Sequence, residues 1–296
     1  MIAHADANYI AHDYLARCNT PCYFVDFAGH ADAQRMTYLA EAEPATMFAV
    51  NYGDDIARPL VEECGGNQVL LEQYLDFIAD RSFRASLLVH GERRADIRYH
   101  VDEARLRALH VAASLTCADA GVQLDQSPQS FRTPAGAVIV VDHPVWKAAA
   151  LALTQAAPFT MSFDQLRDAV RKRTGEAAGE ALDTTLTAFI EAIVVRGLGR
   201  YRLGPVARSR ANPWVSEAAR NYPAHLSEGQ VPHTFNVWHE PVVLNAAGQL
   251  LLSYIDGKRS RAELLVMLEQ GVKQGLSLGA DNADAVLDRL LRGLCA

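Results

Sequence analysis

Apolar residues recur at helical spacing through the first part of the chain, from about residue 8 to residue 115. The first such pattern predicts a helix that Pro21 stops, and a second helix begins at Phe24. The run Gly65-Gly66-Asn67 predicts a helix stop and a turn between two further amphipathic helices. The helical patterns cover residues 9–15, 24–31, 52–64 and 69–79, and two short β-prone runs that can pair as strands cover residues 83–89 and 109–115.

The apolar pattern restarts after a polar break at residues 117–134 and predicts a strand, three helices and a small strand or wing. Ser162 has N-cap chemistry for the second of these helices, with Asp164 and Gln165 in its first turn. This order of elements is typical of a winged-helix domain. The strand is expected at residues 136–141, and an Ala- and Leu-rich helix opens at residues 143–146. The second helix follows the cap at Ser162, the third covers residues 181–195, and the wing covers residues 199–204.

The last part of the chain repeats some of this plan. Its opening run, Val237-Trp-His-Glu-Pro-Val-Val, is similar in pattern to Val141-Asp-His-Pro-Val, and a capped helix follows each. Ser260 and Glu263 have the spacing of a capping box. A duplicated domain explains the similarity, and so do the capping and spacing patterns that unrelated helices share. We therefore expect an α+β protein of three domains: a mixed helix and strand domain at 1–117, a winged-helix domain at 118–206, and a helical, winged-helix-like domain at 207–296.

Charge is distributed unevenly along the chain. Residues 1–115 hold 17 acidic residues and 10 arginines, a net charge of −7, whereas the acidic and basic residues of the remainder balance. An acidic domain repels the phosphates of nucleic acid but tolerates a basic protein or peptide. Simple solubility also accounts for this charge, so the pattern argues against nucleic acid without identifying a partner.

The composition is that of a water-soluble protein. No apolar run approaches the roughly 20 residues that a membrane span needs, and the first residues lack the basic segment of a secretory signal. Five cysteines among 296 residues do not form a disulfide framework. We expect a cytoplasmic protein with reduced thiols and no membrane contact.

The glycine clusters do not fit a nucleotide-type cofactor site. A class I methyltransferase needs a glycine-rich loop after a buried strand, opening a helix within a βαβ unit. The clusters at residues 65–66, 197–204 and 275–279 all lie beside or between helical patterns. Cys18 and Cys22 are spaced too loosely for a typical zinc site, and apolar packing beside Phe24 is the better interpretation. We expect no catalytic residue, no bound cofactor and no metal.

Two sets of charged residues are the candidate contact sites. They are the pair His12 and Asp13 and the set Asp76, Arg81 and Arg84. Acids and bases at such spacing could serve catalysis, but they more often form ion pairs on a surface or between layers. Phe83 is expected to anchor its segment while the two flanking arginines reach outward, toward carboxylates or a partner domain.

A winged helix raises the alternative of nucleic-acid binding. Residues 196–210 carry five arginines and no acid, which suits a wing that contacts phosphates. The helix that should enter the groove, residues 180–191, instead carries two Glu and one Asp and no base-reading Arg, Asn or Gln. Nucleic-acid binding is therefore the weaker hypothesis.

Several motifs also occur together in one known family. The N-terminal ones are Tyr9-Ile-Ala-His-Asp-Tyr-Leu, Pro21-Cys-Tyr-Phe-Val-Asp-Phe and Gln73-Tyr-Leu-Asp-Phe-Ile-Ala-Asp-Arg-Ser-Phe-Arg. The C-terminal ones are Asn212-Pro-Trp-Val-Ser-Glu-Ala-Ala-Arg, Phe235-Asn-Val-Trp-His-Glu-Pro-Val-Val and Leu251-Leu-Ser-Tyr-Ile-Asp-Gly-Lys-Arg-Ser-Arg-Ala-Glu-Leu-Leu.

In this order the motifs resemble the regulatory and C-terminal regions of bacterial S-adenosylmethionine-dependent methyltransferases, the protein-lysine methyltransferases among them. The resemblance implies a role around substrate, in which these domains present a protein's lysine to a catalytic domain. It implies no catalytic residue here, because those of the family lie in a domain that would precede residue 9. The charged set around Phe83 would contact that domain or the loop that joins it.

These expectations lead to one main hypothesis and two alternatives. In the main hypothesis the chain is the non-catalytic regulatory and substrate-recognition portion of a methyltransferase, and the catalytic domain acts in cis or in trans. In the first alternative the gene model is truncated and the native product is an intact methyltransferase. In the second the chain is a winged-helix nucleic-acid-binding protein.

Overall fold

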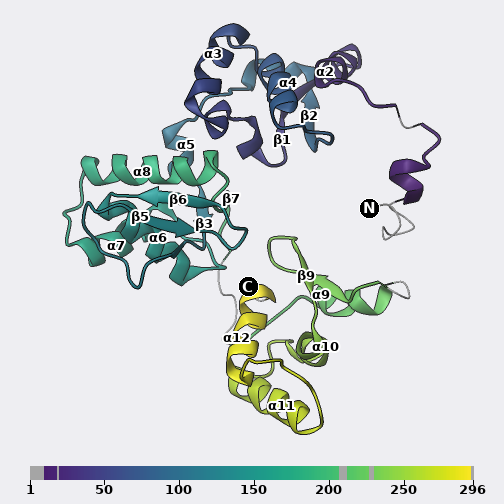
Figure 1. Ribbon diagram of the computed structural model, residues 1–296, viewed down its shortest axis with the longest axis vertical. Coiled ribbons are helices and arrows are strands. Elements are labelled where there is room, and N and C mark those ends of the chain that lie inside the picture. Colours follow the sequence, from purple (N-terminus) through teal and green to yellow (C-terminus); the bar gives the residue numbers. More distant parts are fainter. Residues whose placement is uncertain (1–9, 19, 207–211, 227–229, 295–296) are drawn as a thin grey trace. The chain divides into compact units, whose positions relative to one another are not determined.

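Figure 1 shows a computed structural model of the chain, which describes residues 10–18, 20–206, 212–226 and 230–294. The contacts divide it into two units. Unit 1 comprises residues 1–101 and 195–197, and unit 2 comprises residues 102–194 and 198–296. Both mix helices with short antiparallel strands, which is the α+β class expected from the sequence. The expected boundary at residue 117 lies inside unit 2.

Unit 1 is a helical domain with one two-stranded antiparallel ribbon, drawn in purple and blue in Figure 1. The expected helices after Phe24 are confirmed, each within two residues of its predicted limits. The first pattern forms only a short π-helical turn. The elements are η2 (Ile10–Tyr14), α2 (Phe24–Ala33), β1 (Met36–Glu41), η3 (Pro44–Met47), η4 (Ala49–Tyr52), α3 (Asp54–Cys64), α4 (Gln68–Ile78), β2 (Ser86–His90) and η5 (Gly91–Asp96).

The turn between α3 and α4 forms as its sequence predicts. Gly65 and Gly66 have left-handed backbone angles, with φ of 54° and 84°, which side-chain-bearing residues rarely adopt. The side chain of Asn67 then accepts a hydrogen bond from Leu70 N at 3.1 Å and caps α4. This local chemistry sets where α4 begins, and therefore which of its residues face the interior.

The strand pairing differs from the sequence prediction. The run at 83–89 does contain a strand, β2, but its partner is β1, whose residues the apolar pattern did not single out. The run at 109–115 contains β3 (His110–Ala112), which pairs in unit 2 with β7 (Arg200–Arg202). Strand partners are chosen by contacts far along the chain, and no local pattern specifies them.

The first half of unit 2 contains the elements expected for residues 136–204 (Figure 1, teal). Ser162 and Gln165 form a complete capping box at the start of α7. Phe131, Leu153 and Leu186 are fully buried between the helices and the strands. The elements are α5 (Glu103–Arg107), β3, β4 (Thr116–Cys117), β5 (Gln129–Arg132), β6 (Val138–Val141), α6 (Pro144–Ala156), α7 (Phe163–Thr174), α8 (Glu180–Val195) and β7; strands β4, β5 and β6 form one antiparallel sheet in that order.

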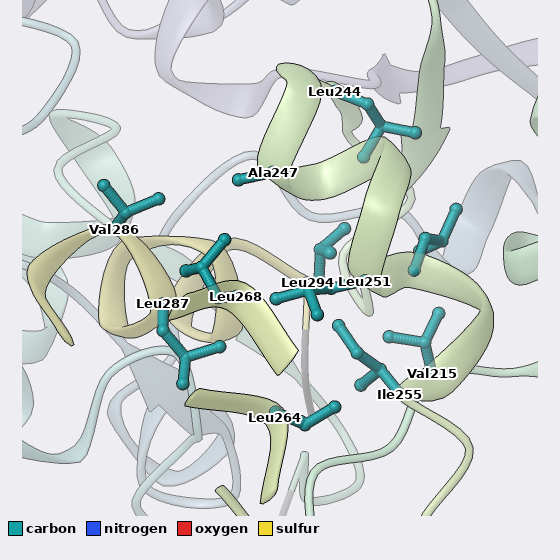
Figure 2. Close-up of a cluster of buried hydrophobic side chains, with 11 residues drawn as sticks. Val215, Leu244, Ala247, Leu251, Ile255, Leu264, Leu268, Val286, Leu287 and Leu294 are labelled. Atoms are coloured by element: carbon teal, nitrogen blue, oxygen red, sulfur yellow. The ribbon is translucent and has the colours of Figure 1, made fainter. Parts of the chain in front are cut away.

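The second half of unit 2 folds around its own leucine-rich core. Figure 2 shows that Val215 and Ile255 lie together while Leu264, Leu268 and Leu287 project from the last two long helices. Ser260 and Glu263 form the predicted capping box at the start of α11. The elements are α9 (Glu217–Asn221), η6 (Tyr222–His225), β8 (His233–Phe235), β9 (Pro241–Val243), α10 (Ala246–Leu251), η7 (Leu252–Tyr254), α11 (Arg261–Lys273) and α12 (Ala283–Leu294).

Candidate functional site

The predicted set Asp76, Arg81 and Arg84 does come together, inside unit 1. Helix α4 turns an unusual polar face toward the interior, where Glu72 is fully buried and Asp76 is 9% exposed. Charged side chains are seldom buried unless they are paired. The partners of these two carboxylates come from the loop after α4 and from β1.

Arg84 is the centre of this network. Its guanidinium group holds Asp76 with two hydrogen bonds of 2.9 Å, in the parallel geometry that makes arginine–carboxylate pairs strong. It also donates to Glu41 at 2.8 Å and to Glu72 at 3.0 Å. The guanidinium lies over the Phe24 ring, 3.6 Å from the ring centre. Arg84 therefore connects β1, α2 and α4.

Burial shifts the proton affinities of the network. It raises the pKa of Glu72, although hydrogen bonds from Gln68, Tyr38 and Arg84 partly oppose the shift. The pKa of Tyr38 is raised in the same way by burial and by the adjacent Glu72 carboxylate, to which its hydroxyl donates at 2.7 Å. Burial alone would lower the pKa of Arg84, but its hydrogen bonds with Asp76 and Glu72 raise it overall.

Arg81 fixes the other side of the same loop. Its guanidinium donates to the Thr46 carbonyl at 3.1 Å and to the Tyr52 hydroxyl at 3.3 Å, and lies 3.3 Å from Asp76 Oδ1. The side chains of Arg81 and Arg84 are both only 13% exposed. Both arginines do reach carboxylates, as one alternative expected, but these carboxylates lie inside unit 1, so the expected outward direction is wrong.

Phe83 between them has the opposite placement from the one predicted. Its side chain is 78% exposed, so the arginines anchor the segment and the phenylalanine projects. Beside it lies a groove of about 560 Å³. The groove is lined by apolar residues that include Cys22, Phe24, Phe27 and Leu87, and by Asp76, Arg81 and Arg84.

His12 and Asp13 do not join this cluster. His12 is exposed in the short turn η2, and within the described part of the chain no contact connects it to the arginines. The side chain of Asp13 lies outside the described residues. Their role as partner contacts stays a prediction.

The sequence reasoning missed Tyr38, Glu41 and Glu72. A signal for Glu72 was present, because Gln68, Glu72 and Asp76 recur every four residues along a mainly apolar helix. Glu41 accepts from Ala85 N at 3.0 Å and from the Ser86 hydroxyl, contacts that span more than 40 residues. Nothing in the local sequence indicates those contacts.

Metal and membrane features can be assessed only for the described residues. Among them no group of three or more His, Cys, Asp or Glu side chains could hold a metal ion. In those same segments no helix has the length and apolarity needed to cross a bilayer. The expectation that Cys18 and Cys22 are buried is wrong, because both are exposed, although Cys22 does lie beside Phe24 and Phe27 in the groove.

The wing proposed for nucleic acid is β7 with its flanking residues, of which 207–211 lie outside the described residues. The guanidinium of Arg200 forms an ion pair with Glu240, 2.7 Å apart. The supposed recognition helix, α8, buries Leu182, Leu186 and Phe189, so that this face is used for packing.

Two segments of the chain match known protein families. Residues 6–90 match the family described as "Predicted methyltransferase regulatory domain". Residues 212–291 match "PKMT, C-terminal winged helix domain", PKMT denoting protein-lysine methyltransferase. The winged-helix match thus lies on the last expected domain, and whether residues 118–206 are its duplicate stays a hypothesis.

Similar proteins are found over nearly the whole chain. The Rickettsia prowazekii (strain Madrid E) protein "Uncharacterized protein RP789" is 21% identical over 285 residues, which is 93% of this chain and 50% of that protein. A structure titled as PKMT2 from Rickettsia typhi in complex with AdoHcy has a TM-score of 0.79 at 21% identity, and a second PKMT2 structure has 0.78 at 19%. Each covers 98% of this chain, which spans 60% and 59% of those chains.

At these identities the structural likeness shows a shared fold, and the two family matches identify the domains. The chain spans about half of the curated relative and about three fifths of the solved structures. It is a methyltransferase-related protein whose first domain is a methyltransferase regulatory domain and whose last is a winged-helix domain of the protein-lysine methyltransferase type.

Proposed function

We propose that this chain is the regulatory and substrate-recognition portion of a class I S-adenosylmethionine-dependent protein methyltransferase, and that it acts with a catalytic domain in cis or in trans. One observation carries the proposal: both matched models describe non-catalytic domains that accompany methyltransferases, and the fold is similar to that of PKMT2 over 98% of the chain. In this role the chain contributes contact surfaces for a protein substrate and for the catalytic domain, and bonds are made and broken elsewhere.

The surface around Phe83 is the candidate docking site for the catalytic domain. Large exposed apolar residues on a soluble protein mark interaction sites when they gather in one place. Phe83 is 78% exposed beside a groove that also contains Phe27 and Leu87, which are 36% and 47% exposed. An aromatic ring beside a groove is the kind of anchor that dominates binding at protein interfaces.

The buried arginines prepare this surface for binding. Arg81 and Arg84 fix the backbone on both sides of Phe83, through contacts to η3, η4, β1 and α4. A loop that is already ordered loses little conformational freedom when a partner binds, so more of the contact energy appears as affinity. The charged set therefore acts on docking indirectly, by holding Phe83 in place.

The docking proposal is tested with a catalytic domain of the PKMT2 type produced as a separate protein. Calorimetry measures its affinity for the chain and for the Phe83→Asp variant. A charge placed where an aromatic anchor becomes buried costs several kcal/mol, so we expect at least about a hundredfold loss of affinity. Val61→Asp is the matched control, because Val61 is 51% exposed on α3 and lies outside the groove. Equal affinities of the two variants would refute docking at Phe83.

The wider proposal is tested by methyl transfer. Labelled S-adenosylmethionine, protein acceptors and the separate catalytic domain are combined with and without the chain. We expect transfer to acceptors to rise only when both proteins are present, and the chain alone to show no binding of S-adenosylmethionine in calorimetry. Micromolar affinity of the chain for the cofactor would contradict a purely non-catalytic role. An upstream reading frame that encodes a glycine-rich cofactor loop would support the truncated-gene alternative.

A further inference from the structure

An aromatic pocket in unit 2, lined mainly by the last domain and by Arg202 of β7, has no place in the function proposed so far. Its volume is about 480 Å³, and its walls include Trp214, Tyr222 and Phe235. The Tyr222 and Phe235 rings meet edge to face, with centroids 4.9 Å apart and planes at 71°. Two rings set this way form a corner that presents more than one π-face to a ligand.

The fold holds these walls in place. Thr234 is fully buried, and its hydroxyl donates to the Ala219 carbonyl, which fixes β8 to α9. The His233 ring packs edge to face on both Tyr222 and Phe235. Val215 and Leu294 also line the pocket and belong to the leucine-rich core of Figure 2. The pocket is therefore part of a packed domain.

The charges around the pocket restrict its ligand. None of the described residues that line it is acidic. The nearby Glu240 carboxylate is already bound by Arg200 at 2.7 Å and by Asn236 at 3.0 Å. A primary ammonium group is strongly hydrated, and the described walls of this pocket offer no carboxylate to replace that water. A quaternary ammonium group donates no hydrogen bonds and is attracted by the faces of aromatic rings.

We propose that this pocket binds the trimethyllysine side chain of a protein segment. The proposal rests on the proposed function for the identity of the ligand, because methylated lysine is what a protein-lysine methyltransferase produces. It assigns the winged-helix domain a second role, in which it retains a product segment after methylation. Selectivity comes from ring faces without a carboxylate, so the unmodified lysine binds more weakly than the methylated one.

Arg202 lines the same pocket and repels a bound cation. This opposing charge allows a test in which the expected result is tighter binding, which a misfolded variant would not show. If the ligand is cationic, Arg202→Gln tightens binding, and we expect a twofold to fivefold gain from removing one partly screened like charge. A neutral ligand held only by apolar contact is indifferent to that substitution.

The experiment titrates the full chain, followed by calorimetry or tryptophan fluorescence, with N-acetyl-trimethyllysine amide at low salt. Two reference probes are N-acetyl-lysine amide and an isostere in which carbon replaces the quaternary nitrogen. We expect both to bind about five to ten times more weakly, the range that a cation–π contact supports. Equal binding of the neutral isostere, or no binding of the trimethylated probe, would overturn the proposal.

Substitutions locate the site. Tyr222→Leu should weaken binding of the trimethylated probe about tenfold, and Tyr222→Phe should preserve it, because the ring face and not the hydroxyl makes the contact. Val61→Ala, on the exposed side of α3 in the other unit and outside both pockets, is the control and should change nothing. If Tyr222→Leu fails to fold, Arg202→Gln decides: tighter binding supports the pocket, and unchanged affinity overturns it. Because no catalytic domain is present, a failure here is distinct from a failure of methyl transfer.

Discussion

Unit 1 and unit 2 each contain a buried cation, and the two are neutralised in different ways. Arg84 in unit 1 is held by the carboxylates of Glu41, Glu72 and Asp76. Lys147 in unit 2 is fully buried at the start of α6, and its ammonium donates to the carbonyls of Gln123, Asp125 and Ser127 at 2.9, 3.0 and 2.5 Å. The arginine is bound by charge, and the lysine is bound mainly by backbone dipoles.

The difference determines what each cation stabilises. The planar guanidinium reaches three carboxylates on β1 and α4, and so joins elements that are far apart in sequence. The compact ammonium gathers oxygens from a single loop, and the carboxylate it contacts among the described residues is that of the exposed Asp125, at 3.3 Å. Loss of Arg84 should therefore disturb a domain, whereas loss of Lys147 should release a loop.

The largest expected effect is that of Arg84→Met. It leaves three carboxylates close together without their cation, and removing one partner of a buried ion pair costs about 3–5 kcal/mol. Denaturant unfolding, with hydrogen exchange to separate the units, should show this loss in unit 1. Arg94→Met is the matched control, since Arg94 pairs with Asp32 on the surface and is 60% exposed. A loss below about 1 kcal/mol would show that the network contributes little.

Lys147→Met should have a smaller effect. The methionine fills much of the same volume, but the carbonyls that accept from Lys147 lose their donor. Each buried group left without a hydrogen bond costs about 1–3 kcal/mol of stability. Because Gln123 and Asp125 lie on an exposed loop, that loop can turn toward water and limit the loss. Faster hydrogen exchange confined to residues 121–129 would confirm that the substitution disturbs only this loop. Lys172→Met, on the exposed side of α7, should leave both exchange and stability unchanged.

The carboxylates around Arg84 should also make the stability of unit 1 depend on pH. The pKa of Glu72 is raised in the fold, so the folded state binds this proton more tightly than the unfolded state. The resulting stabilisation is present below the ordinary pKa of a glutamate, near 4.5, and is lost as the pH rises through that value toward the raised one. Glu72→Gln removes this loss, so the variant should gain stability relative to the wild type between pH 4 and neutrality. If the free energies of unfolding of the two proteins changed in parallel with pH, the raised pKa of Glu72 would be contradicted.

Phe83→Ala should have the smallest effect on stability, within about 0.5 kcal/mol, because the side chain is 78% exposed. Phe24→Ala provides the contrast. That ring is 3% exposed beneath the Arg84 guanidinium, and its loss should cost about 3–5 kcal/mol in thermal or denaturant unfolding. If Phe83→Ala destabilised unit 1 as much as Phe24→Ala, Phe83 would be a packing residue and not a docking residue.

The candidate site was only partly predictable from sequence. The motif that contains Asp76, Arg81 and Arg84 was recognised, and these residues do form one cluster. The orientation of its members was predicted wrongly, because a helix pattern shows which residues share a face but not which charged residues meet a partner there. Arg84 turns inward for Glu41, 43 residues away. That distance also explains why Glu41 itself was missed.

The sequence by itself determined the elements that depend on neighbours along the chain. The glycine turn before α4, the N-cap at Ser162 and the capping box at Ser260 form as predicted, because each is decided by backbone angles and hydrogen bonds within a few residues. The family motifs likewise pointed to the methyltransferase family whose regulatory and winged-helix models match the chain.

Only the tertiary structure decided the strand partners, the inward turn of the two arginines, the projection of Phe83 and the aromatic pocket. Each depends on residues brought together from distant parts of a unit, such as β1 with β2 and Tyr222 with Phe235. The physical reason is that a buried charge or an apolar wall gains its energy from the groups that surround it. Those surroundings exist only once the chain has folded.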